Sequence, residues 1–124
     1  MVKVQEDKQQ IGLTPETDEL LKGFAVTHFG GSQQDAYRFA IAHAIAAGLD
    51  PATAPAGGYS TKYAALGGVE IGTSIRDLLE ILEIGDQSRP FATAEKLAEI
   101  GVRDIARRLQ GNESLADILA EGVI

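Results

Sequence analysis

The fold is decided at residues 8–16, which read KQQIGLTPE. In an extended chain, Ile11 and Leu13 would share one apolar face, and the opposite face would carry Lys8, Gln10 and Gly12. A single short strand is not stable by itself, so this strand needs a partner. No neighbouring segment is an obvious partner, and we therefore expect it to pair with the same strand of a second chain.

A helix is predicted to follow the strand directly. Thr14 is a favourable N-cap, and Pro15 suits the first helical position because its missing N–H would be unpaired there anyway. Apolar residues then recur at helical spacing until Gly30-Gly31, although Gly23 interrupts them at a cost of about 1 kcal/mol relative to alanine.

The second predicted helix is apolar on almost every side. Ser32 is a favourable N-cap, with Asp35 three residues further on, where a capping-box acid belongs. From residue 36 to residue 49 the only clearly polar side chains are those of Arg38 and His43. A helix of this kind is buried on all sides. We expect it to pack either against a second copy of itself or against the C-terminal part of the chain.

This order of elements over residues 8–49 resembles the ribbon-helix-helix DNA-binding fold of Arc/MetJ-type repressors and of many antitoxins. The resemblance is carried by the Leu13-Thr14-Pro15-Glu16 junction and by the Gly31-Ser32 turn before the apolar helix. It implies an intertwined homodimer whose paired strands enter the major groove of double-stranded DNA. The alternative for residues 14–49 is an ordinary amphipathic helical hairpin.

The resemblance also implies which residues would contact DNA. The base contacts would come from the outward face of the strand, at Lys8, Gln10 and Gly12. The phosphate contacts would come from the backbone N–H groups at the start of the second helix, at Ser32, Gln33 and Gln34.

Residues 50–73 are rich in glycine and proline and predict a linker or an ordered loop, including a hairpin that turns at Gly67-Gly68. Residues 74–124 predict about four short helices: one capped by Ser74, one that begins at Pro90 and is closed by Gly101, one over residues 102–109, and one capped by Ser114. The run Thr93–Val102 resembles half of a helix-hairpin-helix motif. The whole chain is thus predicted to be mainly α-helical, with an N-terminal unit at 1–49 and a small helical region at 74–124.

The C-terminal region carries the main basic cluster, which consists of Arg103, Arg107 and Arg108. One interpretation is a second contact with phosphate. The other is that these side chains pair with the nearby acids Asp104, Glu99 and Glu113.

Composition limits the chemistry. The 124 residues include no cysteine, which excludes disulfides and thiol nucleophiles, and a net charge of −7 opposes non-specific binding to nucleic acid. His28 is placed at a helix end and His43 within an apolar helix, so we expect no catalytic site, metal site or cofactor. No segment has the length and apolarity of a membrane span, and no secretory signal is visible, so we expect a cytoplasmic protein.

The sequence therefore predicts a dimeric DNA-binding protein, namely a repressor, an antitoxin or an accessory of a DNA-processing operon. A protein partner could bind through the C-terminal helices. The alternative is an acidic, α-helical interaction module that dimerises without binding DNA.

Overall fold

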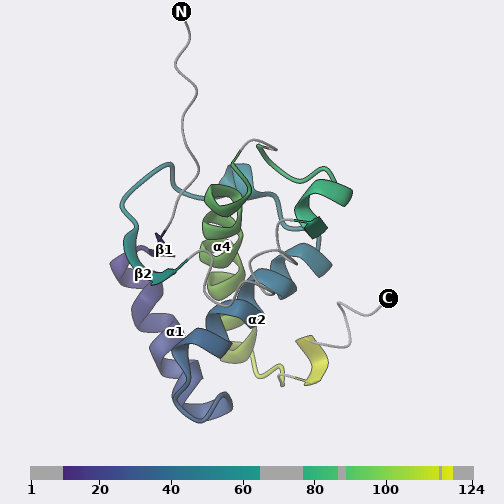
Figure 1. Cartoon of the computed structure of the whole chain (residues 1–124). Helices are drawn as coiled ribbons and strands as arrows, with labels where there is room; N and C mark the ends of the chain where they lie inside the picture. Colours follow the sequence, from purple (N-terminus) through teal and green to yellow (C-terminus); the bar gives the residue numbers. More distant parts are fainter. Residues whose placement is uncertain (1–9, 65–76, 87–88, 115, 119–124) are drawn as a thin grey trace, which may run out of the picture.

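The computed structural model describes residues 10–64, 77–86, 89–114 and 116–118. It is mainly helical and has one short antiparallel sheet of two strands. Figure 1 shows α4, a long helix, near the middle of the molecule, with the two strands and the other helices arranged around it. The named elements are β1 (Gln10–Leu13), α1 (Pro15–His28), α2 (Gln33–Ala46), η1 (Pro51–Thr53), β2 (Ser60–Ala64) and α4 (Pro90–Gln110).

The predicted strand forms, but its partner is not the predicted one. β1 pairs with β2 of the same chain, with Gln10 opposite Ala64 and Leu13 opposite Ser60. A bulge lies between Ile11 and Gly12. The expectation that this strand must find its partner in a second chain is therefore wrong. The segment predicted as a linker or loop contributes η1 and β2 instead, and the proposed turn at Gly67-Gly68 lies outside the described residues.

The two N-terminal helices begin and end close to the predicted residues. α1 has Thr14 as its N-cap residue and His28 in its last turn. Ser32 caps α2, since its hydroxyl accepts a hydrogen bond from the backbone N–H of Asp35. Of the two expected environments for α2, the structure contains the C-terminal one, because α2 packs along α4.

The C-terminal region differs from the prediction at Gly101. This glycine was expected to end one helix before another began, but α4 is continuous through it. A Cβ atom at residue 101 would lie 2.2 Å from the carbonyl oxygen of Ala40. Gly101 thus permits α2 and α4 to approach closely, and it does not end the helix. The half helix-hairpin-helix motif at Thr93–Val102 is ruled out for the same reason, since the run lies inside one helix.

Two shorter helical segments complete the described fold. Residues 77–81 are helical, and Leu79 fixes this segment to the core. Residues 116–118 are helical, and Ser114 and Asp117 cap this turn by reciprocal backbone-to-side-chain hydrogen bonds, as predicted. Ile118 of this turn is buried.

Candidate functional site

The predicted base contacts lie in different surroundings. Gln10 is exposed on β1, whereas Gly12 is buried and Lys8 lies outside the described residues. The N–H of Gly12 donates to a carboxylate oxygen of Glu95 at 2.8 Å, and its carbonyl oxygen accepts from the hydroxyl of Tyr37 at 3.0 Å. Gly12 therefore faces the protein interior and is not placed to contact a base.

Two buried glutamates of α4 hold β1 and the start of α1. Both glutamates are fully buried: Glu95 is 1% exposed and Glu99 is 0% exposed. Glu99 accepts from the backbone N–H of Thr14 at 3.0 Å and from the hydroxyl of Thr17 at 2.7 Å. The hydroxyl of Thr14 and Nε of Arg103 lie 2.9 and 3.1 Å from the same carboxylate.

We call this group of interactions the glutamate clasp: Glu95 and Glu99 with their partners on β1 and α1. It leaves the N–H and carbonyl groups of Gly12 and the N–H of Thr14 bonded to side chains and not to a neighbouring strand. For β1 to pair with a second chain at these positions, the clasp would first have to open. Its two carboxylates are sealed from solvent, so the clasp is suited to hold the fold rather than to bind a substrate.

Sequence reasoning missed the clasp because it assigned glutamates to the surface. A signal for one of them was present. Glu95 continues the helical stripe of Phe91, Ala98, Val102 and Ile105, all of which are buried. A glutamate at a core position of an apolar stripe indicates a buried hydrogen-bond acceptor.

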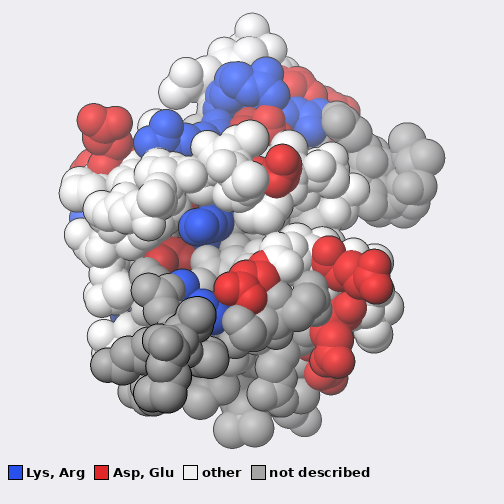
Figure 2. Space-filling model, turned by 90° about the horizontal axis from the view of Figure 1, so that it is seen from above, with Lys and Arg blue, Asp and Glu red and all other residues white. Residues whose placement is uncertain are grey.

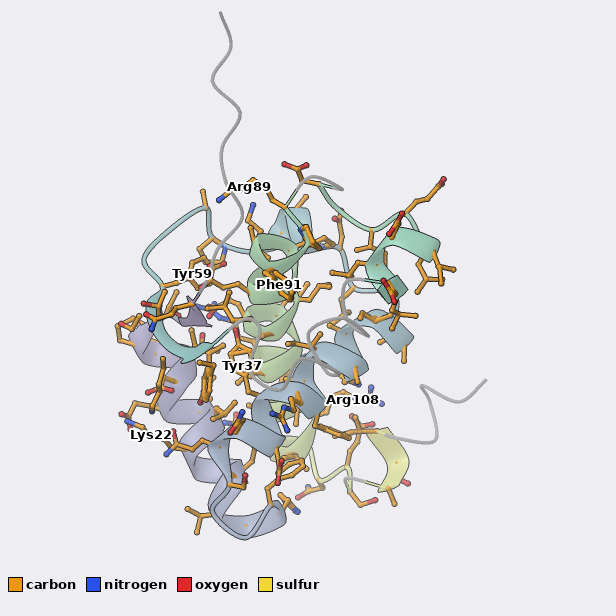
Figure 3. All side chains as sticks on the ribbon, in the orientation of Figure 1. Lys22, Tyr37, Tyr59, Arg89, Phe91 and Arg108 are labelled. Atoms are coloured by element: carbon orange, nitrogen blue, oxygen red, sulfur yellow. The ribbon has the colours of Figure 1, made fainter. Side chains whose placement is uncertain are left out.

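Three tyrosines lie near the clasp and the sheet. Tyr37 and Tyr59 are labelled in Figure 3, and Tyr63 belongs to β2, where its ring lies 4.3 Å from that of Tyr37. Burial, together with the charge of Glu95, raises the pKa of Tyr37. Burial raises the pKa of Tyr59 to about 12, and Glu99 adds to this. Burial likewise raises the pKa of Tyr63 to about 12. The Tyr63 hydroxyl is buried and has no hydrogen-bond partner among the residues that the structure describes.

Polar side chains surround the predicted phosphate site at the start of α2, and one of its three backbone N–H groups, that of Ser32, donates to the carbonyl oxygen of Phe29 at 3.0 Å. Ser32 is bonded to the N–H of Asp35, and the carboxylate of Asp35 lies 3.9 Å from Arg38. The side-chain oxygen of Gln33 accepts from Lys62 at 2.7 Å, and Gln34 is exposed. The described side chains near this site therefore include two cations, Lys62 of β2 and Arg38, and one anion, Asp35.

The predicted basic cluster pairs with the three acids that the sequence offered as partners. Arg103 binds Glu99 at 3.1 Å, Arg107 binds Asp104 at 2.6 Å and Arg108 binds Glu113 at 2.8 Å. Arg108 is buried, and Figure 3 places it toward the C-terminal end of α4. The second interpretation of this cluster, pairing with acids, is confirmed by these contacts.

His43 is buried, and its Nε2 lies 2.7 Å from a carboxylate oxygen of Asp104. Burial raises the pKa of Asp104, but the hydrogen bonds from His43 and Arg107 outweigh it, so the pKa is lowered overall. His43 is therefore a hydrogen-bonded core residue. No described histidine, aspartate or glutamate belongs to a group of three that could hold a metal ion.

The most prominent exposed feature is an apolar patch on residues 77–83. Its side chains lie at helical spacing on the outer side of the segment: Leu78 is 41% exposed, Ile81 76% and Leu82 49%. Leu78, Leu79 and Leu82 form an apolar stripe in the sequence, but of these three residues only Leu79 is buried. Asp77, Glu80 and Glu83 are also exposed on this segment. We call these six residues the acidic apolar patch.

A cleft of about 480 Å³ begins beside this patch. It lies between the end of α2, η1, residues 83–86 and the start of α4. Its lining combines apolar side chains with charged ones of both signs: Ile45, Leu49, Ile84, Asp50, Asp86 and Lys96. Figure 2 shows acidic side chains gathered at the right-hand edge of the molecule, with no described basic side chain beside them.

No helix in the described parts of the chain combines the length and the apolarity needed to cross a bilayer. Comparison with known proteins gave no match: neither a family model, nor a curated protein, nor a solved structure is similar to this chain.

Proposed function

We propose that this chain is a protein-interaction module that binds a basic amphipathic segment of another protein at the acidic apolar patch. The observation that carries the proposal is the exposure of Ile81, Leu82 and Leu78 on one side of a segment whose opposite side is anchored by Leu79. Large apolar side chains that gather on a surface and are bordered by polar ones are typical of binding sites.

The charges around the patch favour a basic partner. Asp77, Glu80 and Glu83 border the apolar side chains, and the whole chain carries a net charge of −7. Lysine or arginine side chains on a partner would be attracted to this border, which raises the rate of association. A second copy would bring the same acids face to face, so this patch is better suited to a different protein.

The neighbouring cleft adds shape to the site. Glu83 belongs to both the patch and the cleft lining, so a bound segment could extend from one to the other. One apolar side chain of the partner could enter between Ile45, Leu49 and Ile84. Buried anchors of this type supply most of the binding free energy at many interfaces.

The test uses defined peptides and a matched pair of variants. The probe is a helical peptide with leucines at positions i, i+3, i+4 and i+7 and lysines elsewhere, labelled for fluorescence anisotropy. We expect it to bind, whereas a twin with glutamates in place of lysines does not. Ile81→Ser should weaken binding by about ten-fold or more, because it removes an apolar contact at the centre of the patch.

Val26→Ser is the control, because Val26 on α1 is 72% exposed, close to the 76% of Ile81, but lies away from the patch. This variant should bind like the unaltered chain. Equal loss of binding in both variants, or no discrimination between the two peptides, would contradict the proposal.

Double-stranded DNA is the second candidate ligand, and one observation favours it. β1 and β2 form an antiparallel ribbon within one chain, and its exposed residues include Gln10, Thr61 and Lys62. Lys62 also reaches the start of α2, where the phosphate contacts were predicted. A gel shift with promoter DNA at low salt, repeated with Lys62→Ala, tests this candidate; binding that is absent or insensitive to Lys62 counts against it.

A further inference from the structure

The cleft beside the acidic apolar patch contains a lysine without a counter-ion. Lys96 of α4 lines this cleft and is half-buried. Its ammonium group makes no hydrogen bond and no ion pair with any residue that the structure describes. The other two described lysines, Lys22 and Lys62, both pair with Asp18, at 3.2 and 3.7 Å. A cation that is partly removed from water favours a place where an anion can join it.

The acids that line the cleft do not pair with this lysine. The carboxylate of Asp50 accepts from the backbone N–H of Ala52 at 2.9 Å and caps η1. Glu83 lies where the cleft meets the patch, and Asp86 lines the cleft further along the chain. Among the described residues none of these three acids forms an ion pair with Lys96. An anion that joins Lys96 would therefore come from a ligand.

The walls of the cleft restrict what that ligand can be. Ile45, Leu49 and Ile84 line it together with Lys96, so the ligand has to offer an apolar group and an anion side by side. The last residue of a protein chain does this when it is apolar, because its side chain and its free carboxylate share one Cα atom. The volume of about 480 Å³ lies within the range of about 300–1,000 Å³ that is typical of ligand cavities.

We propose that the cleft binds the C-terminal residue of the partner segment, with its free carboxylate on Lys96 and its apolar side chain against Ile45, Leu49 and Ile84. This inference rests on the proposed function, because the basic amphipathic part of the segment lies on the acidic apolar patch. It adds the direction of the segment and the chemistry of its end. Capture of a terminal carboxylate is an established mode of peptide recognition.

The net charge of the chain makes the opposite prediction, which gives the test a definite sign. Because this charge is −7, an added negative charge on a peptide weakens the general attraction. A peptide that ends in a carboxamide would therefore bind more tightly than its free-carboxylate twin if only net charge mattered. A preference for the free carboxylate thus identifies a specific contact.

The first experiment compares two forms of the leucine–lysine peptide by fluorescence anisotropy, both ending in leucine and labelled at the N-terminus. We expect the free carboxylate to bind about ten-fold more tightly than the carboxamide. Lys96→Met should remove this preference, and Lys96→Arg should retain part of it. A Gly-Gly extension should bind like the carboxamide, because it moves the carboxylate away from the leucine.

Lys22→Met is the matched control and should retain the full preference. Figure 3 shows Lys22 on α1, well away from Arg89, which lines the cleft. Equal or tighter binding of the carboxamide peptide would overturn the inference, and so would a preference that Lys96→Met leaves intact. Either result would leave the patch proposal standing if Ile81→Ser still weakens both peptides.

A second probe tests the cleft without the patch. N-acetyl-leucine carries the carboxylate and the apolar side chain but no basic helix. At millimolar concentration we expect it to shift the backbone amide resonances of Gly48 and Gly85 in the cleft, whereas N-acetyl-leucinamide should not. If neither peptide binds, the patch proposal fails and this titration decides the inference: a shift that Lys96→Met abolishes supports it, and no shift overturns it.

Discussion

Replacement of Glu99 by glutamine tests whether the glutamate clasp holds β1 and α1 on α4. The carboxylate accepts from the backbone N–H and hydroxyl of Thr14, from the hydroxyl of Thr17 and from Nε of Arg103. Glutamine has nearly the same shape but offers one acceptor oxygen where the carboxylate offers two. At least one of these donors would then face the side-chain NH₂ group of the glutamine, which cannot accept its hydrogen bond.

The expected loss of stability follows from the burial of the Glu99 carboxylate. Hydrogen bonds to a charged group contribute about 1.5–3 kcal/mol each, and a buried donor left without an acceptor costs about 1–3 kcal/mol. Arg103 is partly exposed and Thr14 is half-buried, so water can accept some of the hydrogen bonds that they no longer donate to residue 99. We therefore expect Glu99→Gln to lower the free energy of unfolding by about 2–4 kcal/mol.

Urea unfolding followed by circular dichroism measures this change. Amide hydrogen exchange adds a local measurement, since the N–H of Thr14 should lose protection in the variant. Glu19→Gln is the matched control, because its carboxylate pairs with Lys22 at the surface, 3.4 Å away, and its loss should change stability little. If Glu99→Gln unfolds at the same urea concentration as the unaltered chain, the clasp does not hold the fold together.

Three further predictions concern the core and its charges. Gly101→Ala should destabilise the fold by about 1–3 kcal/mol in the same urea assay, because the added methyl group would force α2 and α4 apart at Ala40. Tyr37→Phe should cost about 1 kcal/mol because it removes the hydrogen bond to β1, whereas Tyr63→Phe should be neutral or stabilising because its buried hydroxyl lacks a described partner; equal effects would contradict this assignment. The pKa of Asp104 is lowered from 3.8 in the folded state, so the ionised carboxylate stabilises the fold above pH 3.8. This stabilisation is lost as the pH falls through the folded-state pKa. In urea unfolding at a series of acidic pH values, the stability of Asp104→Asn should therefore fall less steeply with decreasing pH than that of the unaltered chain.

The sequence was informative where the structure depends on neighbours in the chain. Thr14 and Pro15 indicated the start of α1, and Ser32 indicated the start of α2. Ser32 caps its helix within one turn, through the N–H of Asp35, whereas the hydroxyl of Thr14 makes no capping bond and lies 2.9 Å from Glu99 of α4. The apolar character of α2 required a buried position, and α4 provides it.

The sequence was not informative about the partner of β1, because β2 follows about 50 residues later with no short turn between the strands. Strand pairing at this distance depends on how the helices pack, and no local pattern records it. The role of Gly101 likewise depends on a residue that is distant in the sequence. Within the chain it resembles a helix end, and only the position of Ala40 explains it.

The strand pairing also changes what the N-terminal resemblance can imply. Residues 10–46 do contain a strand followed by two helices, in the order that suggested a ribbon-helix-helix unit. That order alone is compatible with any strand partner, whereas DNA recognition depends on which side chains the finished ribbon presents. Here β2 contributes half of the ribbon, and the glutamate clasp faces β1 at Gly12. The residues that would decide between DNA and a protein partner are thus Lys62 and Ile81, neither of which belongs to the strand that first suggested the family.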